Sequence, residues 1–346
     1  MIVREARAAG RAWVDEEAGR LPGFVGAFFS GSTNEMADDV ELPATSDVDI
    51  LVVVDGPALP KKPGKFLYRG ALLEASYLRS EEIATPEQVL GTSHLAWSLR
   101  AASLISDPVG RLTPLQVAVV RDYAKREWVL RRCAHARDKV LRNLNGLSEA
   151  ATLPDQVNSW LFGSGVTTHI LLVAGLRNPT VRKRYLAVRE LLEEVGRATF
   201  YPTLLEMLGC ARLSRDRVAQ HLTTLAGAFD AAGAAITTPF EFAADMGPIA
   251  RPVAIDGSRE LIEQGDHREA VFWIAVTYTR CQKVLAVDAP AEVHDQHLRG
   301  YRRMLADLGI ASYSDLEQRS DLVKALLPRV WREAEAIMEA TPGIEP

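Results

Sequence analysis

The chain has 346 residues, which is long enough for two or three domains of ordinary size. Its content of 47% hydrophobic and 25% charged residues is typical of a soluble folded protein and excludes a disordered or collagen-like chain. The net charge of −5 argues against a nucleic-acid partner, the charged N-terminus lacks the apolar core of a secretory signal, and no apolar run predicts a membrane span, so we expect a cytoplasmic protein without a membrane partner.

The first eighty residues predict a small mixed α/β domain. Helical spacing of charges and alanines indicates a helix that ends before Leu21-Pro22-Gly23. The elements expected after it are a strand at Phe24–Phe29, a glycine turn, a polar loop at Thr33–Ser46, a strand at Val48–Val54, a basic loop at Lys61–Lys65, and a hairpin of Phe66–Tyr68 with Ala71–Leu78.

The remainder predicts helices almost throughout, because apolar residues recur at spacings of three and four. The expected helices are Glu87–Leu99, Leu115–Leu144, Val157–Leu176, Val181–Val195, Arg215–Ala232, Arg259–Gln264, Arg268–Ala286, Ala291–Leu308 and Asp315–Met338. A segment rich in proline and glycine, Thr237–Ser258, reads as a linker between two helical groups. We therefore predict an α+β fold, with a first domain over 1–110, a helical bundle over 111–240 and a second helical group over 241–346.

Two acids open the second strand. Asp47 and Asp49 are two residues apart, and the period of a strand places both carboxylates on one face, roughly 6 to 7 Å apart. The apolar residues around them supply no compensating Lys or Arg, so a divalent metal ion is expected to relieve their repulsion. Glu74 is an isolated acid in a third apolar strand; alone it would suit a solvent-facing edge, but beside the aspartates it suits a third metal ligand.

This set of residues resembles the polymerase-beta-type nucleotidyltransferase superfamily. The resemblance is carried by Gly31-Ser32 after a strand, by Asp47-Val48-Asp49 opening the next strand, and by the later strand acid Glu74. The order of elements is similar to that of the antibiotic nucleotidyltransferases of the kanamycin type. It is clear over about residues 6 to 78 and fainter to about residue 194.

The resemblance implies a nucleotidyltransferase fold and magnesium-dependent transfer of a nucleoside monophosphate. Asp47, Asp49 and Glu74 would hold two Mg²⁺ ions, which commonly share carboxylates with substrate phosphates. Gly31 would let the backbone approach the phosphates of ATP or another nucleoside triphosphate, and Ser32 would donate hydrogen bonds to them. A homodimer is implied in the same way. An ordinary turn is the alternative for Gly31-Ser32 alone.

Two groups that the resemblance leads us to expect are less clear. The four residues after Ser32 are Thr33-Asn34-Glu35-Met36, none of them basic. Lys139 and Arg142 are therefore the candidates for phosphate contacts, with Arg182 and Lys183 next; a solvated helix face is the alternative.

The general base is expected near Ala136, which cannot serve. Asp138 is the candidate, and His135 and Glu127 are the others nearby. Surface or helix-pairing roles are open for all three of these side chains.

The sequence thus favours transfer of AMP from ATP to a hydroxyl of a small molecule such as an aminoglycoside-like antibiotic. Two alternatives remain at this point. The acceptor could be a protein hydroxyl, as in protein adenylyltransferases, or the chain could be a nucleotide-binding protein that has lost catalysis.

Overall fold

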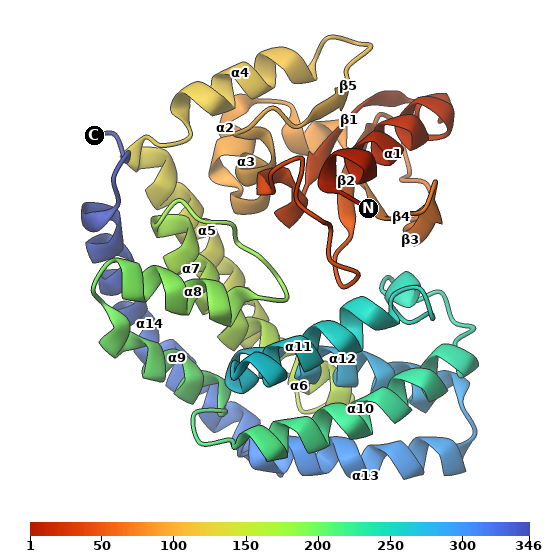
Figure 1. Ribbon diagram of the computed structural model, residues 1–346. Helices are drawn as coiled ribbons and strands as arrows, with labels where there is room; N and C mark the ends of the chain where they lie inside the picture. Colours follow the sequence, from red (N-terminus) through yellow and green to blue (C-terminus); the bar gives the residue numbers. More distant parts are fainter. The chain divides into compact units, whose positions relative to one another are not determined.

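The computed structural model describes residues 1–346 and divides the chain into two compact units. The first unit comprises residues 1–132 together with the C-terminal residues 343–346, and the second comprises residues 133–342. The sheet lies in the first unit and the second is helical, so the predicted α+β class is confirmed (Figure 1). The three domains expected from the sequence stay a prediction.

A mixed five-stranded sheet forms the centre of the first unit, in the order β3-β4-β2-β1-β5. β2 and β4 pair in parallel, and the other neighbours are antiparallel. Its strands are β1 (Phe24–Ser30), β2 (Val48–Val54), β3 (Gly64–Tyr68), β4 (Ala71–Arg79) and β5 (Leu104–Ser106). The strands predicted before residue 80 are present, whereas the short edge strand β5 was not predicted.

The hairpin of β3 and β4 turns at Arg69-Gly70. Both residues have positive φ, at 48° and 81°, which is the conformation of a tight two-residue hairpin turn. The turn pairs Tyr68 with Ala71 and, farther along, Lys65 with Glu74. Lys65 therefore belongs to a strand, and its assignment to a basic loop was wrong.

Helices cover both faces of the sheet, because its strands alternate apolar side chains toward either side. On one face, α1 (Val3–Glu16) packs Ala6, Ala9 and Trp13 against Ile50 and Val52 and their neighbours. The opposite face is covered by three helices, α2 (Pro86–Gly91), α3 (Ser93–Leu99) and α4 (Leu112–Asp122). Asp47 and Asp49 alternate with the residues that face α1, so their side chains lie on the side of α2, α3 and α4.

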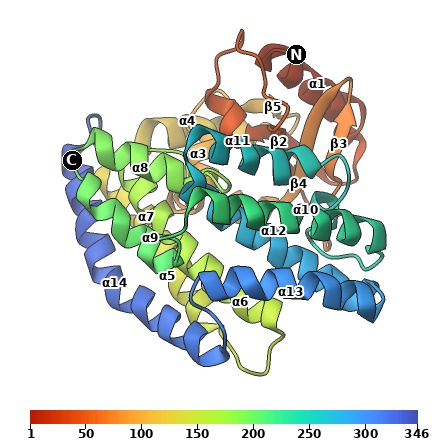
Figure 2. The ribbon, with the colours of Figure 1, turned by 60° about the horizontal axis from the view of Figure 1, so that its bottom comes forward.

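The second unit is built around one buried helix, α12 (His267–Asp288), which packs against α6, α8, α10, α11 and α13 (Figure 2). α14 packs against α6, α7 and α9. The other helices are α5 (Arg126–Asn145, which begins in the first unit), α6 (Leu153–Gly165), α7 (Thr167–Ala174), α8 (Arg184–Glu194), α9 (Tyr201–Leu208), α10 (Arg215–Ala235), α11 (Gly257–Gln264), α13 (Ala291–Asp307) and α14 (Tyr313–Ala340).

Three of the helices expected from the sequence are each two helices in the structure. α2 and α3 separate at Thr92, α4 and α5 separate after Asp122, and α6 and α7 separate at Val166. The apolar segment Leu153–Ala174 is long enough to cross a membrane, but 78% of its most apolar 18-residue stretch is buried inside the protein, as in the core of a soluble globular protein. Its hydrophobicity therefore reflects helix packing within the second unit.

Candidate metal site

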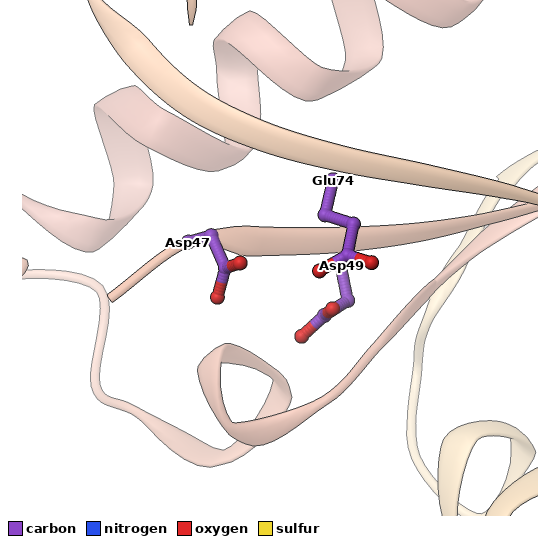
Figure 3. Close-up of side chains that lie close together, drawn as sticks. All are labelled: Asp47, Asp49 and Glu74. Carbon is purple, nitrogen blue, oxygen red and sulfur yellow. The ribbon is translucent and has the colours of Figure 1, made fainter. Parts of the chain in front are cut away.

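The three acids singled out in the sequence come together on one side of the sheet. One carboxylate oxygen from each of Asp47, Asp49 and Glu74 lies within 4.8 Å of the other two. Figure 3 shows the three side chains gathered beside neighbouring strands. Asp49 and Glu74 are direct neighbours in the register of the parallel strands β2 and β4, and Asp47 immediately precedes β2. The juxtaposition therefore follows from strand register, which the rigid sheet holds in place.

The register extends this pair into a row of four residues across the sheet. Ser30 on β1 pairs with Asp49, Asp49 with Glu74, and Glu74 with Lys65 on β3. Such cross-strand neighbours have Cβ atoms about 4.5 to 5.5 Å apart, so the side chains on one face interact directly.

Gly31 follows Ser30 and packs against the side chain of Asp49. Its φ of 69° lies in the left-handed region, which glycine adopts without strain. A Cβ atom at Gly31 would lie 1.8 Å from Oδ2 of Asp49, so no other residue fits while that carboxylate keeps its place. The glycine turn predicted from sequence thus packs directly against the carboxylate of Asp49.

The loop after Gly31 is fixed to its surroundings. Ser32 is exposed and begins a short 3-10 helix, Ser32–Glu35. Asn34 Nδ2 donates to the carbonyls of Phe29 and Ser98 at 3.0 and 3.3 Å. The hydroxyls of Ser30 and Ser98 are hydrogen-bonded at 2.8 Å. The hydroxyl of Ser32 is therefore presented to solvent from an anchored turn.

A lysine that sequence reasoning missed lies among the acids. Lys65 Nζ is 2.5 Å from Asp47 Oδ2 and also bonds Glu74 Oε2, and its side chain is only 7% exposed. Lys62 Nζ contacts the other oxygen of Glu74 at 2.8 Å from a more exposed position. The expectation that no Lys or Arg compensates the acids was wrong, because β3 brings both lysines beside β4.

The lysines compensate the acids unequally. Burial opposes ionisation of Glu74, but the charges and hydrogen bonds of Lys65 and Lys62 outweigh it and lower its pKa to about 2. For Asp49, burial raises the pKa well above its ordinary value, and the charges of Asp47 and Glu74 raise it further. Lys65 and Lys62 only partly offset this. The negative charge of Asp49 is therefore less well compensated by the lysines than that of Glu74.

This donor set fits a hard divalent cation. Mg²⁺ takes oxygen ligands and is commonly held by one or two carboxylates while it keeps several waters. A cation bound by Asp47, Asp49 and Glu74 would remove the repulsion that disfavours ionisation of Asp49. Since Lys65 bonds two of the three acids, it would have to release at least one carboxylate oxygen when such an ion binds.

The candidates for the general base and the first candidates for phosphate contacts lie on α5, whereas Arg182 and Lys183 directly precede α8. Asp138 is exposed and lies 3.7 Å from Arg137. Lys139 and Arg142 are also exposed and form no ion pair. His135 is partly buried and its Nδ1 has no hydrogen-bond partner. The candidate site is therefore the group of three acids in the first unit, and the roles of Asp138, Lys139 and Arg142 stay predictions.

No protein-family model, curated protein or solved structure matches the chain.

Proposed function

We propose that the protein is a magnesium-dependent nucleotidyltransferase that transfers a nucleoside monophosphate, AMP from ATP, to a hydroxyl of a small molecule such as an aminoglycoside-like antibiotic. The observation that carries the proposal is the convergence of Asp47, Asp49 and Glu74 within 4.8 Å beside Gly31-Ser32. The resemblance of the same residues to polymerase-beta-type nucleotidyltransferases gives this acidic site its reaction class. We also propose a cytoplasmic location, where ATP and Mg²⁺ are abundant.

Each residue of the site has a physical role in this proposal. Asp47, Asp49 and Glu74 would hold Mg²⁺, which when bound supplies positive charge to neutralise the phosphates. Gly31 has no side chain that would displace the Asp49 carboxylate, and its backbone is the part of the turn that the resemblance assigns to the phosphates. The exposed hydroxyl of Ser32 is available to donate to a phosphate oxygen.

Lys65 has a role that the sequence did not suggest. In the absence of a metal ion, its ammonium neutralises Asp47 and Glu74 and keeps the acidic cluster assembled. An ammonium released from one of these carboxylates would remain beside the site and could bond a phosphate oxygen. This supplies a basic group at the site, where the sequence after Ser32 offers none.

The test combines binding with turnover. Calorimetric titration with Mg²⁺ and ATP, and a pyrophosphate-release screen against hydroxylated antibiotics, are performed on the wild type and on Asp47→Asn with Asp49→Asn. Asp39→Asn, an exposed acid of the nearby loop, is the matched control. We expect the double variant to lose metal-dependent ATP binding and pyrophosphate release, and the control to keep both. Unchanged binding and release in the double variant would end the proposal.

One observation favours a second candidate, a nucleotide-binding protein without catalysis. Lys65 already supplies a cation to two of the three acids, so the cluster is partly neutralised without a metal ion. Tight ATP binding without pyrophosphate release, for any acceptor tested, would support this second function. Intact-mass spectrometry of co-expressed proteins would reveal an added nucleotide if the acceptor is a protein hydroxyl.

A further inference from the structure

The second unit contains a buried arginine without a counter-ion. Arg184, at the first position of α8, is 1% exposed and has no carboxylate partner. Its Nε donates to the carbonyl of Val181 at 2.8 Å, and its guanidinium carbon lies 3.9 Å from the centre of the Phe272 ring. Its Nη1 is buried and has no acceptor. Arginine stays charged at neutral pH, so this is a buried cation with an unused donor.

A second unused donor lies against the same aromatic ring. Tyr185 is fully buried, and its ring centre is 6.1 Å from that of Phe272. Its hydroxyl has no hydrogen-bond partner. Buried polar groups in folded proteins are nearly always paired, since an unpaired one costs about 1 to 3 kcal/mol. Two neighbouring orphaned donors therefore point to an acceptor that the chain itself does not provide.

A second cation, Lys139 on α5, lies in the electrostatic field of Arg184. Burial of Arg184 lowers its pKa to about 9, which still leaves it protonated at neutral pH. Burial also lowers the pKa of Lys139 on α5, and the largest electrostatic contribution to that shift comes from Arg184. Lys139 has no carboxylate partner, so its ammonium adds positive charge near Arg184.

We infer that Arg184 and Tyr185 form the core of a binding site for a small oxyanion of the phosphate type in the second unit, with the charge of Lys139 in support. Arginine and lysine donate charge-assisted hydrogen bonds to phosphate, and a tyrosine hydroxyl adds a neutral donor. An anion would satisfy both buried donors and supply the counter-charge that Arg184 lacks. The source could be free phosphate or the phosphate of a larger ligand. The inference does not require the proposed nucleotidyl transfer.

Ligand-dependent stabilisation and calorimetry test the site. Inorganic phosphate and ATP are titrated in parallel, without Mg²⁺ and at constant ionic strength, into the wild type and its variants. We expect phosphate to raise the unfolding temperature of the wild type in a concentration-dependent way. Arg184→Met should abolish this rise, and Lys139→Met should weaken binding by about tenfold. A response to ATP alone, lost in the same variants, would identify the source as a larger phosphate ligand.

Conservative variants and controls separate binding from folding. Tyr185→Phe removes only the hydroxyl, so it tests the site even if Arg184→Met fails to fold, and we expect about tenfold weaker binding. Arg302→Met removes an exposed charge on α13 and should leave binding unchanged. Asp47→Asn with Asp49→Asn, which disables the proposed catalytic site, should also leave it unchanged. Equal responses in the wild type, Arg184→Met and Tyr185→Phe, or no response at all, would overturn the inference.

Discussion

Replacing Lys65 by methionine should unfold the acidic region locally. Lys65 is 7% exposed, and its partners Asp47 and Glu74 are 16% and 18% exposed, so all three charges lie largely out of water. Removing one partner of a buried ion pair typically costs about 3 to 5 kcal/mol, because the other charge is left uncompensated. At an effective dielectric of about 20, two carboxylates 4.8 Å apart repel by about 3.5 kcal/mol. We therefore expect the opening free energy of this region to fall by about 3 kcal/mol. The fall is smaller if Asp49 takes up a proton, because one of the repelling charges is then removed.

The control for this variant is Lys62→Met. Lys62 also contacts Glu74, at 2.8 Å, but its side chain is 38% exposed, and exposed ion pairs contribute about 0 to 1 kcal/mol. Hydrogen exchange of the amides of β2 and β4, measured by mass spectrometry, reports the opening free energy of this region alone. Mg²⁺ should increase the hydrogen-exchange protection of these amides more in Lys65→Met than in the wild type. Equal protection in the two lysine variants would refute the reasoning.

Three further predictions concern the glycine turn, acid stability and helix packing. Gly31→Ala should weaken Mg²⁺ binding measured by calorimetry, since a methyl group collides with Asp49; Gly110→Ala, also at positive φ but with open space around it, should not. Because the pKa of Glu74 is lowered to about 2, its carboxylate contributes about 3 kcal/mol to the free energy of unfolding above pH 4.5. This contribution is lost between about pH 4.5 and 2, so the free energy measured by urea unfolding should fall over that range. Glu74→Gln should remove this pH dependence. Gly165→Ala, whose Cβ would lie 2.2 Å from Phe272, should lower the unfolding free energy by about 1 to 3 kcal/mol in denaturant titrations. An unchanged affinity, an unchanged slope or an unchanged free energy would contradict the respective prediction.

The sheet and its acids could be predicted because their signals are local. Alternation of apolar residues identifies β2 and β4, and the two-residue period places Asp47 and Asp49 on one face. β5 was missed because it has only three residues, all partly exposed, and so shows little apolar alternation.

Lys65 could not be recognised in the same way. It follows Pro63-Gly64, which is a typical loop signal, and its contact with Glu74 depends on hairpin register. A signal was nevertheless available, because the Arg69-Gly70 turn fixes that register and pairs position 65 with position 74. The contact between Gly31 and Asp49 could not be predicted from the sequence, since it depends on how the chain turns after β1. The splitting of three helices was missed because apolar spacing continues across each break.

β3 ends the sheet on one side, so Lys65 belongs to an edge strand. Edge strands offer unpaired backbone groups to other chains, and an inward-pointing charge there opposes such pairing because the stacked chain would have to accommodate it. We therefore expect the lysine that neutralises the acids to disfavour edge-to-edge pairing of the sheet as well. Preparations that lack this charge should self-associate more readily as concentration rises.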